Sequence, residues 1–127
     1  MALTAIDPDA VAEARTGVPT EELLGTVVEA FQALADRTRA RILYGLIRRP
    51  LCVRDLAVLV DVSESAVSHQ LRFLRDRRLV KPERSGNVIY YSVDDHHVAA
   101  LFQEAEYHAD HVRSGLPDHP YPSHRSQ

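Results

Sequence analysis

Residues 51–80 constrain the fold of this chain more than any other stretch. Apolar residues follow helical spacing on both sides of a short polar break, which predicts one helix over 53–60 and a second over 64–77. Ser63 stands where the N-cap of the second helix is expected, and Asp61 occupies the turn position where glycine is commonest. Aspartate tolerates the left-handed conformation that such a turn requires. The pattern is typical of a helix-turn-helix.

The second of these helices separates an apolar face from a polar one. Val67, Leu71 and Leu74 form its inward stripe, and polar or cationic side chains occupy its other faces. Many two-helix corners occur in proteins that never bind nucleic acid, but this polar face favours DNA. The residues predicted to read bases are Ser65, Ser68, His69 and Gln70. The residues predicted to neutralise phosphates are Arg72, Arg75 and Arg84.

A β-hairpin is predicted directly after the helix-turn-helix. Two β-rich runs, 79–83 and 88–93, flank the turn sequence Arg84-Ser85-Gly86-Asn87. A hairpin in this position is a wing, which would bring Lys81, Arg84 and Asn87 to the phosphate backbone or the minor groove. A plain β-ribbon that supports the core is the alternative.

The charge distribution agrees with a DNA-binding centre. Residues 37–84 carry twelve Lys and Arg against five acids, a net charge of +7, although the whole chain has a net charge of −3. The flanking segments 1–36 and 85–127 carry net charges of −6 and −4. A basic segment can be a solvated face, but this asymmetry is also the footprint expected for phosphate contact.

Helices are also predicted before the helix-turn-helix. Residues 1–19 form an acidic extension, in which a short helix over 8–16 and partial disorder are both compatible with the sequence. A firmer helix follows Thr20, with apolar residues at helical spacing. Asp36 caps a third helix, and Pro50 ends it.

The expected architecture is mainly α with a small β-hairpin, a winged helix-turn-helix. Residues 20–113 make up this domain together with its dimerisation helices, and residues 1–19 precede it. Residues 114–127 contain His and Pro among short polar residues, and we expect them to form a flexible tail.

The last predicted helix carries metal-ligand side chains at both of its ends. At 100° per residue, His108 returns to within about 20° of His97, and His111 lies within about 40° of it. The three histidines therefore share one face, and Asp95 lies beside them at the helix start. Solvated surface histidines are the plain alternative to a metal site.

A single copy of this helix cannot bring both ends to one ion. Eleven residues of helix rise about 16 Å, whereas ligands of one zinc ion lie only a few ångströms apart. Two antiparallel copies can close two identical sites across a two-fold axis, each with three imidazoles and one carboxylate. This ligand set suits Zn(II) best, and Co(II) would enter the same cage. His119 and His124 either add ligands, which would favour six-coordinate Ni(II) or Co(II), or belong to a solvated tail.

With these motifs placed, the chain resembles the ArsR/SmtB family of metal-responsive transcriptional repressors over roughly residues 23–113. The motifs LCVRDLA, VSESAVSHQLRFLR, the G-x-x-x-YY hairpin and D-x-H…H-x-x-H occur in the family's order and spacing. The resemblance implies a homodimer joined by the first main helix and the C-terminal helix. It implies operator binding without metal, and release or weakening of that binding when metal occupies the dimer interface. The family's C-terminal-helix site, the type that takes zinc, cobalt or nickel, maps onto Asp95 and His97 of one protomer with His108 and His111 of the other.

The chain departs from the family at a second, thiol-rich site. That site needs Cys-x-Cys near Cys52, but position 54 is Arg, and neither Cys nor His precedes Cys52. A second metal site is therefore not expected, and Cys52 is expected to be a small buried hydrophobe. As the one cysteine of the chain, it excludes an internal disulfide and fits a reducing compartment.

Other functions remain as alternatives. The chain could be a winged-helix repressor that responds to a different signal, with histidines that do not sense metal. A metalloenzyme is not expected, because the sequence has no HExxH, no Gly-rich phosphate loop and no Ser/His/Asp arrangement. A metal-storage protein would need neither a basic helix-turn-helix nor a wing. The sequence has no run of membrane-spanning length and no signal pattern, which predicts a cytoplasmic protein without membrane contact.

Overall fold

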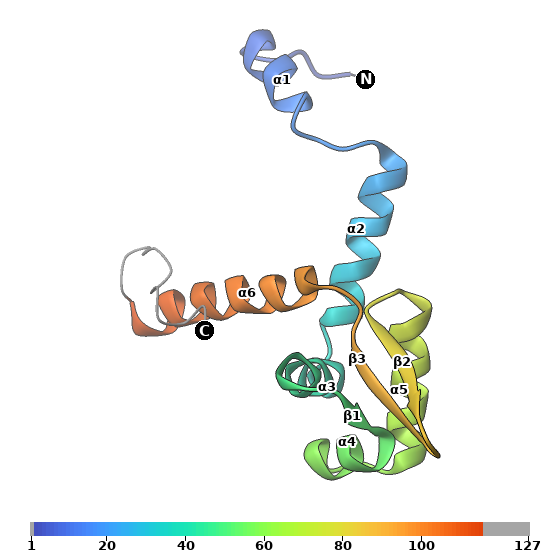
Figure 1. Ribbon diagram of the computed structural model, residues 1–127. Coiled ribbons are helices and arrows are strands. Elements are labelled where there is room, and N and C mark those ends of the chain that lie inside the picture. Colours follow the sequence, from blue (N-terminus) through green and yellow to red (C-terminus); the bar gives the residue numbers. More distant parts are fainter. Residues whose placement is uncertain (1, 116–127) are drawn as a thin grey trace. The chain divides into compact units, whose positions relative to one another are not determined.

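A computed structural model of the chain describes residues 2–115 and divides into two compact units between Ala35 and Asp36. The first unit holds α1 (Pro8–Arg15) and α2 (Glu21–Leu34) (Figure 1). Helix α1 begins where the sequence allows a short helix, because Asp7 accepts a hydrogen bond from the backbone N–H of Ala10 at 3.1 Å and Pro8 starts the helix. Thr20 caps α2 in the same way, through the N–H of Leu23 at 3.2 Å.

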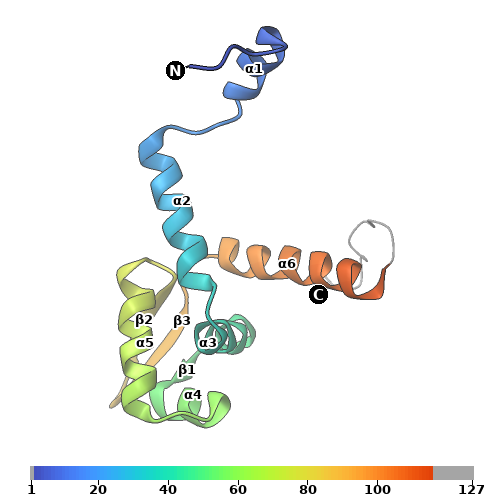
Figure 2. The same ribbon diagram turned by 180° about the vertical axis from the view of Figure 1, so that it is seen from behind.

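The second unit is the winged helix-turn-helix that the sequence predicts. Figures 1 and 2 show the strand Val80–Ser85 of its small sheet running beside the helix Glu64–Asp76. Its elements, in chain order, are α3 (Arg37–Arg48), β1 (Leu51–Cys52), α4 (Val53–Val60), α5 (Glu64–Asp76), β2 (Val80–Ser85), β3 (Val88–Val93) and α6 (His96–Ser114).

The corner between α4 and α5 forms as its local sequence predicts. Asp61 adopts the left-handed conformation, with φ 57° and ψ 50°, and ends α4. Ser63 then caps α5 by accepting a hydrogen bond from the N–H of Ala66 at 3.0 Å. This geometry turns the apolar stripe of each helix towards the other, so that both stripes enter one core.

The core of the second unit lies between α3, α4 and α5. Its fully buried side chains have at most 1% of their surface exposed, and burial of each stabilises the fold by about 1.5–3 kcal/mol. They are Ile42, Leu43, Leu56, Val67, Leu71, Leu74 and Val80. The core confirms the inward stripe predicted for α5.

The sheet differs from the predicted hairpin in two respects. Its turn contains only Gly86 and Asn87, since Ser85 already pairs with Val88, and Gly86 takes the positive φ of 65° that a tight turn needs. A third strand, β1, adds to the other side of β3, with Cys52 opposite Tyr90, in the order β1-β3-β2. Cys52 is consequently half-buried, and not the fully buried side chain that we expected.

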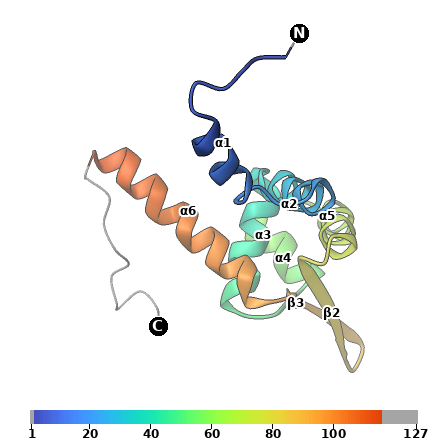
Figure 3. The same cartoon turned by 90° about the horizontal axis from the view of Figure 1, so that it is seen from above.

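Helix α6 leaves the sheet at Asp95 and extends away from the other elements of the second unit (Figure 3). It is 19 residues long and ends at Gly115, which has a positive φ of 69°. Val98 and Phe102 are buried, whereas Leu101 remains exposed. Among the residues that the structure describes, neither this helix nor any other is long and apolar enough to cross a membrane.

Candidate functional site

The first group of candidate metal ligands lies at the start of α6. Asp95 is the N-cap, and its Oδ1 accepts a hydrogen bond from the N–H of His97 at 2.9 Å. The same oxygen lies 3.4 Å from Nδ1 of His97, and both side chains are more than half exposed. Two donors at about 2.0–2.1 Å from a tetrahedral zinc ion are themselves roughly 3.3 Å apart. Asp95 and His97 thus already have the separation of neighbouring ligands.

The second group lies near the end of the same helix. The ring centroids of His108 and His111 are 6.3 Å apart. Two imidazoles on one tetrahedral ion have ring centres roughly 5 Å apart, so about 1 Å of side-chain adjustment would suffice. Nδ1 of His111 is buried and has no hydrogen-bond partner among the described residues. Such a nitrogen can bind a metal ion. The donors at both ends of α6 therefore fit a divalent metal ion.

The two groups do not meet within one chain. Among residues 2–115, no three His, Cys, Asp or Glu side chains gather closely enough to hold a metal ion. His97 and His108 are eleven residues apart on one straight helix, which separates them by about 16 Å along its axis. Each chain therefore presents two separate groups of candidate ligands on one helix. The predicted extra ligands His119 and His124 lie outside the described residues.

The candidate DNA-reading face is the solvent side of α5. Ser65, Ser68, His69 and Arg72 are exposed there. Arg75 is also exposed, and α5 places it on the flank of this face. The side chains can reach a partner because Val67, Leu71 and Leu74 fix the opposite side of the helix in the core.

Gln70 has a different environment from the other predicted base readers. It is half-buried, and its Oε1 accepts a hydrogen bond from Nη1 of Arg39 at 3.4 Å. One turn further on, two guanidinium groups lie over the ring of Phe73, with Cζ of Arg39 4.3 Å and Cζ of Arg77 3.6 Å from the ring centroid. Sequence reasoning missed Arg39, because a basic residue near a helix start gives no signal that it will reach a helix 31 residues later.

The wing brings a second cationic group to the surface. Arg84 belongs to β2 opposite Ile89, rather than to the turn. It shares with Arg49 an open hollow of about 410 Å³, whose other lining residues are Pro50, Glu83, Ser85 and Tyr90. The sequence did not single out Arg49, since only the pairing of β1 with β3 brings the end of α3 near the wing.

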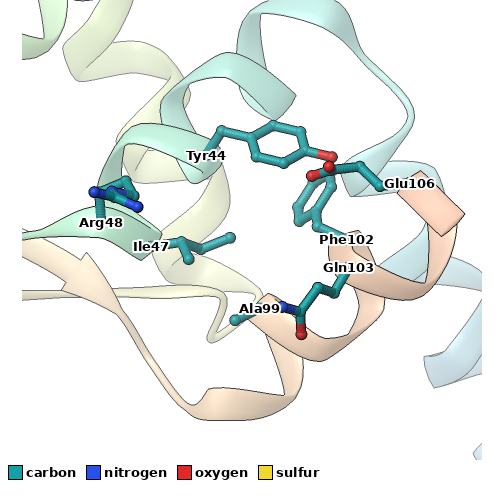
Figure 4. A pocket seen from close by; sticks show the side chains of 7 residues that line it. All are labelled: Tyr44, Ile47, Arg48, Ala99, Phe102, Gln103 and Glu106. Atoms are coloured by element: carbon teal, nitrogen blue, oxygen red, sulfur yellow. The ribbon is translucent and has the colours of Figure 1, made fainter. Parts of the chain in front are cut away.

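A pocket of about 540 Å³ separates α3 from α6 (Figure 4). Its lining residues are Tyr44, Ile47, Arg48, Ala99, Phe102, Gln103 and Glu106. Partial burial raises the pKa of Tyr44 to about 12, and a hydrogen bond to Glu106 and the negative charge of that carboxylate act in the same direction. The phenol therefore keeps its proton at neutral pH and donates a hydrogen bond to the Glu106 carboxylate.

Comparison with known proteins places this arrangement in a family. The model of the arsR family of bacterial regulatory proteins matches residues 36–81, which run from the N-cap of α3 into β2. The regulator NmtR of Mycobacterium tuberculosis is 50% identical over 95 residues, which cover 74% of this chain and 79% of that protein. The chain belongs to the ArsR/SmtB family of metal-responsive transcriptional repressors.

Other relatives agree with this assignment. A transcriptional repressor SmtB homolog of Synechocystis is 53% identical over 87 residues, which cover 68% of this chain and 64% of that protein. The solution structure of apo-NmtR matches with a TM-score of 0.61 at 39% identity, over 96% of this chain and 92% of that one. The homodimeric winged helix-turn-helix DNA-binding domain of Mb0332 from Mycobacterium bovis matches with a TM-score of 0.71 at 27% identity, over 82% and 98%.

Membership of the ArsR/SmtB family confirms the predicted fold and the general class of activity. The chain is a transcriptional regulator and not an enzyme, and it belongs to a family of homodimeric DNA-binding proteins. The identity of the metal and of its ligands depends on the side chains that this chain carries on α6.

Proposed function

We propose that the metal-free homodimer of this protein binds operator DNA and that a divalent metal ion on α6 weakens this binding. Each of two identical sites would be formed by Asp95 and His97 of one protomer with His108 and His111 of the other. Zn(II) is the metal that these four donors suit best, and Co(II) or Ni(II) are the alternatives. Because operator DNA is the proposed target, the proposed place of action is the cytoplasm.

The observation that carries the proposal is the pair of incomplete sites on one face of α6. Asp95 and His97 have ligand spacing at one end, and His111 has a buried nitrogen without a described partner at the other. Neither end has enough donors by itself, but two antiparallel helices supply the missing half to each other. A two-fold axis therefore produces both sites at once.

Exposed apolar side chains support a partner on the proposed dimerisation helices. On α2, Leu23, Val27, Val28 and Phe31 are each 38–56% exposed in the single chain. On α6, Leu101 and Val112 are 39% and 62% exposed. Apolar groups at regular helical spacing lose contact with water when a second copy covers them, which favours association by about 25 cal/mol per Å².

The residues of α6 and α5 have different tasks in this mechanism. A bound metal ion would be coordinated by three imidazoles and one carboxylate, which come from both protomers. The four side chains would then fix the relative position of the two α6 helices. Recognition helices must lie about 34 Å apart to enter successive major grooves, so a different dimer geometry costs DNA affinity. A coupling free energy of about 1–3 kcal/mol corresponds to a 5- to 150-fold change in affinity.

The test is a titration of Zn(II), Co(II) and Ni(II) into the full chain bound to fluorescent DNA from the promoter beside its own gene. Fluorescence anisotropy at fixed salt reports the affinity. We expect at least one metal to lower the affinity about tenfold or more. His97→Ala and His108→Ala should bind the DNA normally and lose the response.

His96→Ala is the matched control, because His96 is a neighbouring exposed histidine whose ring centroid lies 4.1 Å from that of His97. It is expected to keep the response. If the wild-type protein binds the DNA equally well with and without every metal, the proposal is wrong, and a winged-helix repressor that responds to another signal takes its place.

A further inference from the structure

The face of helix α6 that carries the histidines and the face that contacts α3 lie on nearly opposite sides of the helix. Taking His108 as the reference at 100° per residue, Glu106 lies about 160° away, Ala99 about 180° and Phe102 about 120°. These three residues line the pocket towards α3. The proposed metal ligands are therefore on one side of the helix, and its contact with the DNA-binding unit is on the other.

Tyr44 of α3 makes the contact on this second side. Its ring centroid lies 4.8 Å from that of Phe102, with the ring planes inclined at 51°. Its hydroxyl donates a hydrogen bond to Glu106, and Figure 4 shows the hydroxyl directed at that carboxylate. Tyr44 thus holds α6 through two residues that are four positions apart, which is one turn of the helix.

Tyr44 acts beside other contacts of α6, since Val98 and Tyr107 of the same helix are also buried. An open pocket of about 540 Å³ lies between the two helices beside this contact. Helix α6 is joined to the sheet only at its N-terminal end, and it reaches well beyond the pocket. The Tyr44 side chain therefore joins α3 to two successive turns of α6.

The other end of α3 contacts the recognition helix. Arg39 donates a hydrogen bond to Gln70 and lies over the ring of Phe73, both on α5. Arg39 and Tyr44 belong to one helix of 12 residues and are about 7.5 Å apart along its axis. One rigid helix therefore contacts the proposed metal helix through one side chain and the DNA-reading helix through another.

We propose that Tyr44 is a positioning residue whose contact with Glu106 and Phe102 sets the orientation of the histidine face of α6 relative to α5. This inference rests on the proposed function. The contact determines how strongly a metal ion on α6 changes DNA affinity, because a helix that is free to rotate can satisfy the metal without moving the DNA-binding unit. Neither Tyr44 nor Glu106 touches the metal or the DNA in this arrangement.

Three variants of the full chain test the role of the contact. Tyr44→Phe removes the hydroxyl and keeps the ring, Glu106→Gln removes the carboxylate charge, and the third variant combines both changes. DNA affinity is measured by anisotropy with and without Zn(II). Without metal, we expect each single variant to bind DNA with near wild-type affinity. The ratio of the DNA affinity without Zn(II) to that with Zn(II) should fall about threefold or more. The double variant should lose no more than the larger single effect, since both changes break one contact.

Glu104→Gln is the matched control. It removes the same charge from the same helix, but Glu104 is exposed and lies only about 40° from His108, on the histidine side. A purely electrostatic effect on a bound metal would be at least as large in this variant. An affinity ratio that changes equally in Glu104→Gln and Glu106→Gln would overturn the positioning role.

Hydrogen exchange of the metal-free protein gives a readout that does not depend on metal. In Tyr44→Phe, the backbone amides of α6 beyond Glu106 should exchange about two- to tenfold faster, while those of α5 should not change. If the wild-type protein responds to metal and Tyr44→Phe keeps the same affinity ratio, the inference is wrong. If the wild-type protein does not respond, the proposed function fails instead, and unchanged exchange in α6 would then refute the positioning role as well.

Discussion

A heterodimer with His97→Ala in one protomer and His108→Ala in the other is expected to bind one metal ion. Both substitutions fall into the same one of the two proposed sites, so the second site keeps Asp95, His97, His108 and His111. A heterodimer of the double variant His97→Ala/His108→Ala with a wild-type protomer should bind none, because each of its sites lacks one histidine. The wild-type dimer should bind two.

The expected numbers follow from the geometry of α6. His97 and His108 are separated by about 16 Å along the helix, whereas bonds to zinc are about 2 Å long, so the ligands of one site lie within about 4 Å of each other. The two histidines of one chain therefore cannot share an ion. If each chain instead closed its own site, the first heterodimer would bind none and the second would bind one. The two arrangements thus give opposite results.

Two different affinity tags allow each heterodimer to be purified free of homodimers. Tight sites are then counted by competition with a chromophoric chelator, and the visible absorbance of Co(II) reports their geometry. Both single-variant homodimers serve as controls that should bind no metal tightly. One ion in the double-variant heterodimer and none in the other would refute the arrangement across the dimer.

Three further results are expected. Arg72→Ala should weaken binding to all DNA sequences and lower the steepness of the salt dependence by about one, and an unchanged slope in anisotropy titrations would show that Arg72 does not contact a phosphate. Asp61→Ala should be less stable than Asp61→Gly by about 1 kcal/mol in urea unfolding, because the φ of 57° strains alanine but not glycine, and equal stabilities would contradict this reasoning. The pKa of Tyr44, raised to about 12 by partial burial and by Glu106, means that the folded state holds a proton which the unfolded state loses near pH 10. The stability advantage of the wild-type protein over Tyr44→Phe should therefore shrink as the pH rises from 10 towards 12, and a constant difference in urea midpoints would argue against the contact.

Local sequence was sufficient to predict most of the helical framework. Ser63, Asp36 and Asp95 each cap a helix through their own side chains, and Asp61 ends α4 in the conformation that its position implied. Such features depend on a few neighbouring residues, and apolar periodicity then selects the buried face. The separation of the proposed metal ligands on α6 follows in the same way from the rise of a single helix.

Contacts between distant segments could not be predicted from these patterns. Strand β1 has only two residues, too few to show a period, and it exists because Cys52 pairs with Tyr90 far along the chain. Gln70 is among the residues predicted to read bases, and no local pattern indicated that its side-chain carbonyl accepts a hydrogen bond from Arg39.

The sequence by itself thus determined which residues form each helix, which of their faces is apolar, and which donors could bind a metal. The tertiary structure alone decided that α3 contacts both α5 and α6, with Tyr44 against Glu106 and Arg39 against Gln70. The physical reason is that caps and periodicity are set by interactions within one or two helical turns. The approach of two helices depends instead on how all their side chains fill the space between them.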